Sequence, residues 1–145
     1  MQAMILPDIN LLLYAHNEAI PQHAAARAWW EDLMTNERAV AIPWAVSFGF
    51  IRLSTHPAVF RDPLPPLEAL ERVRAWLARP HVQILEPGGR HLSIVESLFT
   101  ATGVAGSLTT DTHLAALAIE HQCELHSNDS DFGRFPGLRW RNPLE

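Results

Sequence analysis

Short apolar runs alternate along this chain with longer segments in which apolar residues recur at helical spacing. The short runs predict buried strands at residues 4–6, 39–42, 81–85, 123–127 and 138–140. The helical segments begin near Leu11, at Gln22, after Pro43, at Leu67, at Arg90 and at Ser107. Strands separated by helices of this length predict an α/β fold, namely a three-layer α/β/α sandwich built on a short parallel sheet.

The helix predicted to begin at Gln22 carries two adjacent tryptophans. Its apolar stripe is expected to include Ala25, Ala28, Trp29 and Leu33. Neighbouring residues on a helix point in different directions, so Trp29 and Trp30 cannot both face one core. One of the two tryptophans is therefore expected to meet a partner protein.

The composition is typical of a single globular domain over residues 1–145. Apolar residues make up 48% of the 145 residues and charged residues 19%, as in ordinary folded proteins. No apolar run is long enough to span a bilayer, and no basic leader precedes one, so we expect no membrane partner and a cytoplasmic location. The single cysteine, Cys123, is expected to fill the core in a reducing compartment.

The charge pattern narrows the possible chemistry. The net charge is −5, and all 11 basic residues are arginine. There is no general basic surface for nucleic acid, and every mechanism that needs a lysine is excluded. The missing lysine argues against aspartyl-phosphate phosphatases and phospho-acceptor receiver domains. Arginine, whose planar fork suits phosphate, is the one basic side chain left for binding it.

Four acidic residues are predicted to lie at one edge of the sheet. Asp8 directly follows the first strand, and Asp129 and Asp131 follow the fourth. The helix that Ser107 is expected to cap runs back toward the same edge, with Asp111 in its first turn on the apolar stripe. Ligands bind beyond the carboxyl ends of the strands in open parallel sheets, so this edge is the predicted site.

Clustered carboxylates require either protons or a bound cation. Two unit charges about 5 Å apart repel by roughly 3 kcal/mol at an effective dielectric constant of about 20. Oxygen-only donors favour hard ions, namely Mg²⁺ or Mn²⁺. Each acid also has an ordinary structural alternative. Asp8 can cap the following helix, Asp111 can favour the dipole of its own helix, and Asp129 or, preferably, Asp131 can cap the short turn that follows.

Four segments together resemble the PIN-domain nucleases, and specifically the VapC-like toxins of type II toxin–antitoxin pairs. They read PDINLLLYAH, GFIRLSTHP, DTHLAALAIEHQCELHSNDSDF and FPGLRWRNPL, and they extend over nearly the whole chain. The resemblance implies a PIN-like fold and a Mg²⁺- or Mn²⁺-dependent endoribonuclease that cleaves single-stranded RNA, with tRNA as a candidate substrate. It also implies a cognate antitoxin and a homodimer mate as partners.

The resemblance also assigns roles to individual residues. The family's catalytic, metal-binding acids fall on Asp8, Asp111 and Asp129, with Asp131 as a supporting acid. The expected chemistry is in-line attack on a phosphodiester by a cation-activated water. Asn10 and Ser127 flank the acids and are expected to orient waters or ligands. Arg52 is a candidate for binding phosphate, and a surface ion pair is its alternative role.

One position departs from the family pattern. The family usually has a glutamate in the third helix, where this chain has Gly49. The second ligand is then either missing or replaced by water, by Ser47 or by a backbone oxygen. The glycine keeps open an alternative function, a PIN-like module that binds RNA or an antitoxin with weakened or no catalysis. The histidines, including His113 and His121, form no zinc motif and are expected on the surface or in hydrogen bonds.

Overall fold

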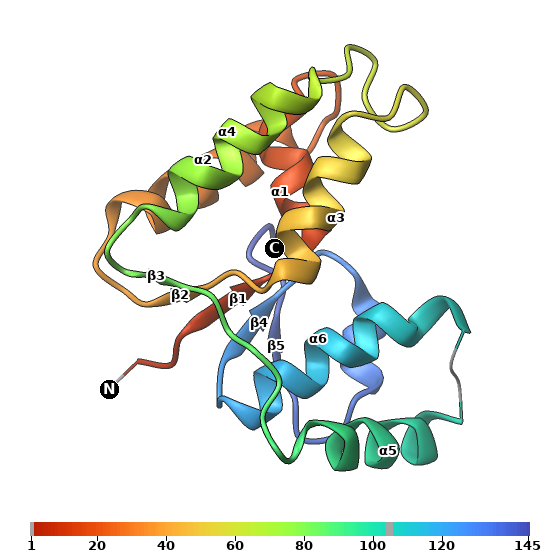
Figure 1. The fold of residues 1–145 in the computed structure, drawn as a ribbon. Helices are drawn as coiled ribbons and strands as arrows, with labels where there is room; N and C mark the ends of the chain where they lie inside the picture. Colours follow the sequence, from red (N-terminus) through yellow and green to blue (C-terminus); the bar gives the residue numbers. More distant parts are fainter. Residues whose placement is uncertain (1, 104–105) are drawn as a thin grey trace.

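The computed structural model describes residues 2–103 and 106–145, and its centre is a five-stranded parallel sheet (Figure 1). The strands are β1 (Ile5–Pro7), β2 (Val40–Ala41), β3 (Val82–Gln83), β4 (Glu124–His126) and β5 (Arg139–Arg141). Their order is β3-β2-β1-β4-β5, and every neighbouring pair is parallel. The strand order therefore reverses between β1 and β4, and ligands bind at such a switch point, beyond the carboxyl ends of the strands.

Helices connect the strands and cover both faces of the sheet. They are α1 (Ile9–His16), α2 (His23–Thr35), α3 (Trp44–Ser54), α4 (Pro66–Leu77), α5 (His91–Thr102) and α6 (Thr109–Glu120). In Figure 1, α1 to α4 lie toward the top of the view, whereas α6 lies to the right of β4 and β5, with α5 below it. Contacts join α1 to α2 and α3, α3 to α4, and α5 to α6. The predicted three-layer α/β/α sandwich is confirmed. Within the described residues, no helix has the length and apolar character needed to cross a membrane.

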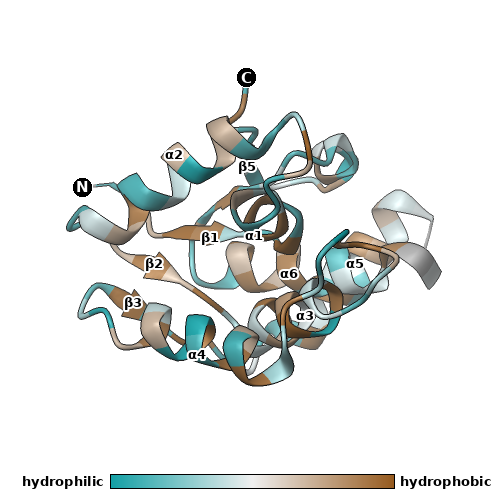
Figure 2. Ribbon diagram, turned by 90° about the horizontal axis from the view of Figure 1, so that it is seen from above, coloured by the Kyte–Doolittle hydropathy of each residue, from teal (hydrophilic) through white to brown (hydrophobic). Residues whose placement is uncertain are grey.

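The central strands β1 and β2 are buried throughout because helices cover the sheet on both sides, whereas the edge strands β3 and β5 include exposed polar residues. Leu6, Val40 and Leu125 have no exposed surface, as expected for the inner strands of a parallel sheet. Figure 2 shows β1, β2 and β3 in the hydrophobic colour, whereas the outer parts of α2 and α4 include hydrophilic stretches. Cys123 is buried in the same core, and burial raises the pKa of its thiol to about 11.

The buried face of α2 differs from the predicted stripe. The buried residues are Ala26, Trp30, Leu33 and Met34, so the predicted stripe was wrong at Ala25 and Ala28, which are exposed, whereas Trp29 is partly buried and packs against the core. Trp30 packs edge-on against Trp76 of α4, with ring centroids 5.3 Å apart. Trp29 is half-buried, and its indole Nε1 donates a hydrogen bond to Nδ1 of His126 at 3.1 Å. Both tryptophans thus have partners within the chain itself.

The start of α6 also differs from the expectation. Ser107 lies in a 3₁₀ turn, Gly106–Leu108, and the helix begins at Thr109, with Leu108 in the N-cap position. The predicted cap at Ser107 was therefore placed too early, and the side chain of Ser107 lies outside the described part of the chain. In the predicted loop before it, residues 104 and 105 are also outside the described part, and Gly103 ends α5 with a φ of 67°.

Candidate active site

Asp8 stands at the switch point of the sheet, directly after β1. Only 6% of its surface is exposed. Its backbone N donates to the carbonyl oxygen of His126 at 2.8 Å, which ties the end of β1 to the end of β4. Its Oδ1 accepts a hydrogen bond from the backbone N of Ile9 at 2.8 Å, so Asp8 does cap α1. One carboxylate oxygen has a structural role, and the other is held by a side chain.

That side chain is Ser127, which is fully buried just beyond β4. Its Oγ donates to Oδ2 of Asp8 at 2.8 Å and accepts from the backbone N of Asp129 at 3.0 Å. The same Oγ accepts from Nδ2 of Asn10 at 3.3 Å. The carbonyl oxygen of Ser127 accepts from the indole Nε1 of Trp140 at 3.0 Å. Ser127 therefore joins β1, the start of α1, the turn after β4 and β5 at one hydroxyl-bearing residue.

Asp129 and Asp131 divide the roles differently from the preferred sequence interpretation. Asp129 is the N-cap of a short 3₁₀ helix, Ser130–Arg134, and its Oδ1 accepts from the backbone N of Asp131 at 2.9 Å. The preference for Asp131 as the cap was therefore wrong. The Asp131 carboxylate is partly exposed and lies 3.4 Å from Nε of Arg134. Of the two acids, Asp129 is the one bound into the network of Ser127.

Asp111 lies in the first turn of α6 and is half-buried. Burial, followed by the charges of Asp8, Asp129 and Asp131, raises the pKa of Asp111 to about 6. Burial also raises the pKa of Asp8, helped by Asp129 and opposed by the hydrogen bonds from Ser127 and Ile9. The structure thus brings the four acids within electrostatic range of one another. In the described part of the chain, however, no three acidic, histidine or cysteine side chains are close enough to form a ready-made metal site.

Gly49 lies where α3 packs against the start of α1. A Cβ built on Gly49 would overlap Cδ1 of Ile9 and lie 3.0 Å from its Cγ1. The side chain of Ile9, next to Asp8, therefore occupies the space that a larger residue at position 49 would need. Ser47, another candidate for the missing ligand, is fully buried, and its Oγ has no hydrogen-bond partner among the described residues.

Arg52 is not brought to the acids. It is exposed in the last turn of α3, whereas the first turn of that helix follows β2 at the carboxyl edge of the sheet. Arg52 forms no ion pair within the described part of the chain, and its role in binding phosphate stays a prediction.

His126 is a site-adjacent residue that sequence reasoning did not single out. It is 4% exposed, and its Nε2 lies 2.7 Å from Oε1 of Glu124. Because Nδ1 accepts from Trp29, the proton of the neutral ring is on Nε2. Burial lowers the pKa of His126, although Glu124 opposes this effect. The signal was the position of His126 directly before Ser127 in a predicted strand.

The other histidines are hydrogen-bonded, as expected. Nε2 of His91 lies 2.9 Å from Nδ1 of His113, and Nε2 of His121 lies 3.0 Å from the carbonyl oxygen of Glu86. The described residues contain no group of histidine, cysteine and acidic side chains suited to zinc.

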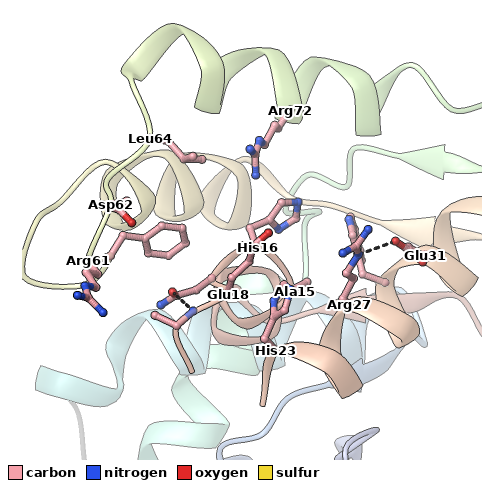
Figure 3. A pocket seen from close by; sticks show the side chains of 14 residues that line it. Ala15, His16, Glu18, His23, Arg27, Glu31, Arg61, Asp62, Leu64 and Arg72 are labelled. Carbon is pink, nitrogen blue, oxygen red and sulfur yellow. Dashed lines mark hydrogen bonds and ion pairs between the residues drawn. The ribbon is translucent and has the colours of Figure 1, made fainter. Parts of the chain in front are cut away.

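A cavity of about 470 Å³ lies away from the acids, and Figure 3 shows it from close by. It is formed by the end of α1, the first half of α2, the segment after α3, and α4. Its lining mixes charges of both signs, including Arg27 and Glu31, whose Nε and Oε1 are 2.8 Å apart. His16 also lines it, and burial lowers the pKa of His16 to about 4. None of the four acids contributes to this cavity.

The exposed aromatic residues belong to α3 rather than α2. Trp44 is 45% exposed and Phe48 is 61% exposed, with ring centroids 6.1 Å apart. Trp44 also lines an apolar groove with Leu70 and Val73 of α4. Exposed aromatic side chains are enriched at protein interfaces. Trp44 and Phe48 meet this criterion, whereas Trp29 and Trp30 contact other residues of the chain.

Comparisons with known proteins agree with this architecture. Residues 5–138 match the family model of the PIN domain. The chain is 46% identical over 141 residues to ribonuclease VapC33 of Mycobacterium tuberculosis, which covers 97% of this chain and 99% of that relative. It is 39% identical over 140 residues to ribonuclease VapC37 of the same species, covering 97% of each chain.

Solved structures of low sequence identity share the fold. VapBC2 from Rickettsia felis, bound to a DNA fragment from its promoter, matches with a TM-score of 0.67 at 20% identity, covering 96% of this chain and 98% of that chain. VapC20 of Mycobacterium tuberculosis, described as a sarcin-ricin loop cleaving toxin, matches with a TM-score of 0.65 at 16% identity, covering 93% and 98%. The chain therefore belongs to the PIN domain family, among its VapC-type ribonucleases.

Proposed function

We propose that this protein is a Mg²⁺- or Mn²⁺-dependent endoribonuclease toxin of a type II toxin–antitoxin pair, acting on single-stranded regions of RNA in the cytoplasm. The observation that carries the proposal is the group of four carboxylates at the β1–β4 switch point, where burial, followed by the charges of the other three acids, raises the pKa of Asp111. Ionised carboxylates that repel one another in a partly buried site favour a bound cation. The ribonuclease names of the relatives support the same activity.

The donor set fits a hard divalent cation. Asp8, Asp111 and Asp129 would hold it, with Asp131 as a further acid, because carboxylate oxygens suit Mg²⁺ and Mn²⁺. When bound, such an ion lowers the pKa of water and offsets negative charge on a phosphodiester. The protein's own contribution is to orient the carboxylates. Ser127 fixes Oδ2 of Asp8 and the backbone of Asp129, which leaves lone pairs on the carboxylates for a ligand.

We propose RNA as substrate and a cognate antitoxin protein and a second copy of the chain as partners. Two solved structures of similar fold, VapBC2 and a second protein called FitAB (TM-score 0.68 at 15% identity), are both bound to DNA fragments, which supports a role in such a paired system. The description of VapC20 as a toxin that cleaves the sarcin-ricin loop supports structured RNA as the substrate class. Transfer RNA is the first pool to test for this chain.

The alternative function is a PIN-like binding module with weakened catalysis. Gly49 favours it, because Ile9 fills the place where the family usually has a glutamate. Such a protein would bind RNA or antitoxin without turning over substrate.

Cleavage of an end-labelled tRNA pool by the purified protein, free of antitoxin, tests the proposed function. Parallel reactions contain Mg²⁺, Mn²⁺ or EDTA, and Asp8→Asn is the matched variant. We expect discrete cuts with either metal, none in EDTA, and a loss of about 100-fold or more in Asp8→Asn, since it removes a ligand charge. Cuts that persist in Asp8→Asn would contradict the proposed site, and metal binding without cleavage of any RNA would favour the binding module.

A further inference from the structure

Asn10 has a buried amide oxygen that no group in the described part of the chain satisfies. We propose that Oδ1 of Asn10 is a neutral oxygen ligand of the divalent cation, in place of the acid that this chain lacks at Gly49. The inference rests on the proposed function and adds a residue of this chain to its metal site. It follows from the orientation of Asn10, from the packing at Gly49 and from the size of the ion.

The orientation of the Asn10 amide follows from the single proton of Ser127. The Ser127 hydroxyl lies within hydrogen-bonding distance of three groups, at 2.8, 3.0 and 3.3 Å. An ionised Asp8 only accepts, so Ser127 must donate to it. Its two lone pairs then require donors, which are the backbone N–H of Asp129 and the Nδ2 group of Asn10. The amide nitrogen of Asn10 is therefore directed at Ser127, and Oδ1 points away from it.

An unsatisfied buried carbonyl is unfavourable by about 1–3 kcal/mol. The amide of Asn10 and the carboxylate of Asp8 are held by the same hydroxyl oxygen, at 3.3 and 2.8 Å. This shared anchor brings the two groups to one place beside the switch point. A cation shared with Asp8 would satisfy Oδ1, and amide carbonyl oxygens are among the ligands that Mg²⁺ and Mn²⁺ accept.

Burial from water does not exclude such an ion. A hydrogen-bonded water lies about 2.7 Å or more from its acceptor, whereas Mg²⁺ lies about 2.0–2.1 Å from an oxygen ligand. An ion can therefore contact an oxygen that is closed to water.

The glycine at position 49 leaves room in the proposed ligand set for another oxygen. Gly49 has no side chain to offer, and the side chain of Ile9 occupies the space beside it. Gly49 belongs to α3, which packs against α1. Asn10 follows Ile9 in α1, so its oxygen would come from α1 in place of an acid from α3. An amide also adds no negative charge to a site in which the carboxylates already repel one another.

Direct titration of Mn²⁺ into the full chain, followed by electron paramagnetic resonance, tests the proposal without RNA. The decisive variant is Asn10→Asp, which keeps the oxygen but removes the donor to Ser127. A ligand role predicts Mn²⁺ binding at least as tight as in the wild type. A role confined to donating to Ser127 predicts weaker binding, because an ionised carboxylate cannot donate. Because the added charge itself attracts a cation, weaker binding in Asn10→Asp is the result that would overturn the ligand role.

Two further variants complete the experiment. Asn10→Ala removes the oxygen and should weaken Mn²⁺ binding by about tenfold or more. Asn36→Asp adds the same charge at the C-cap of α2, before β2 and thus at the opposite edge of the sheet, and should leave the affinity unchanged. Thermal unfolding confirms that each variant is folded.

The outcomes separate the two proposals. If the wild type binds Mn²⁺ and Asn10→Asp binds it more weakly, the ligand role of Asn10 is overturned and the proposed function stays intact. The same conclusion follows if Asn10→Ala binds Mn²⁺ with unchanged affinity. Absence of Mn²⁺ binding in the wild type would overturn the metal dependence itself, and the ligand role with it. If Asn10→Ala fails to fold, the comparison of Asn10→Asp with the wild type and Asn36→Asp still decides the question.

Discussion

Two polar regions of this molecule, the cavity between α1, α2 and α4 and the acids at the β1–β4 switch point, differ in whether their charges are balanced by opposite charges. The cavity in Figure 3 is spacious, at about 470 Å³, and its charged residues include both signs, with Arg27 paired to Glu31. The acids at the β1–β4 switch point line no part of that cavity, and burial together with their like charges raises the pKa of Asp111 to about 6. The proposed active site is therefore distinguished from the cavity by unfavourable like charges that a hydrogen-bonded framework holds in place, and not by its volume.

Removing an acid from the switch point should separate activity from stability. Asp111→Asn is expected to lower RNA cleavage by about 100-fold, because it removes a ligand charge. The same change should raise the free energy of unfolding in EDTA at pH 7.5 by about 1 kcal/mol, after discounting for the partial exposure of Asp111. A carboxylate whose pKa is raised in the folded state opposes folding when it is ionised.

Arg27→Gln is the matched variant in the cavity. It should leave cleavage unchanged, because Arg27 lines the cavity, where it pairs with Glu31, and none of the four acids lines that cavity. Equal losses of activity in Asp111→Asn and Arg27→Gln would remove the distinction between the two regions.

Loss of the Ser127 hydroxyl should be the largest change in stability. Ser127→Ala leaves partners on Asp8, Asp129 and Asn10 unsatisfied, so we expect the free energy of unfolding to fall by about 3 kcal/mol. Ser54→Ala is the control, since Ser54 is equally buried but its Oγ has no partner in the described part of the chain. Its effect should stay within about 0.5 kcal/mol in urea unfolding. Similar values for the two variants would show that the Ser127 network contributes nothing.

Acidification should lower the free energy of unfolding through His16, which lines the cavity. Nδ1 of His16 lies 2.7 Å from the carbonyl oxygen of Leu12, and burial lowers the pKa of His16 from 6.5 to about 4. Between those two pH values the unfolded chain binds a proton that the folded chain does not, so stability falls as the pH decreases. The loss approaches about 3 kcal/mol below pH 4 and is absent above pH 7. In His16→Gln the urea-unfolding profile should be flatter over this window, and an unchanged profile would exclude His16 as its source.

The ion pair in the cavity should matter least. The side chains of Arg27 and Glu31 are 60% and 62% exposed, so Glu31→Gln should change the free energy of unfolding by no more than about 0.5 kcal/mol. High salt should remove even that difference. An effect of 2 kcal/mol or more would mean that the cavity holds an organised charge network after all.

The sequence predicts at which edge of the sheet a residue lies better than it predicts which side chains that residue contacts. The position of Asp8 after a strand, and of Asp129 after another, is enough to put both at one edge, because parallel strands share their carboxyl ends. The hydrogen bond between Ser127 and Asp8 joins residues 119 positions apart, and its geometry depends on how the strands are spaced.

Two predictions were wrong because they depended on a detail of the backbone: the rotation of a helix by one residue in one case and the geometry of a turn in the other. Trp30 rather than Trp29 is buried, because the face of α2 that meets the core is rotated by one position from the predicted stripe. Asp129 rather than Asp131 caps the 3₁₀ helix. The sequence does not distinguish the two acids as caps, because the residue at which the backbone enters the turn decides which one it is.

The contact between Gly49 and Ile9 couples the effects of substitutions at the two positions. The atom that a Cβ at position 49 would meet is the terminal Cδ1 of Ile9, at the end of a flexible side chain. A larger residue at position 49 therefore requires Ile9 to adopt another rotamer or to become shorter, and shortening it to alanine would leave a void that destabilises the protein by about 2–5 kcal/mol. The effects of substitutions at positions 9 and 49 on the free energy of unfolding are thus expected to be non-additive.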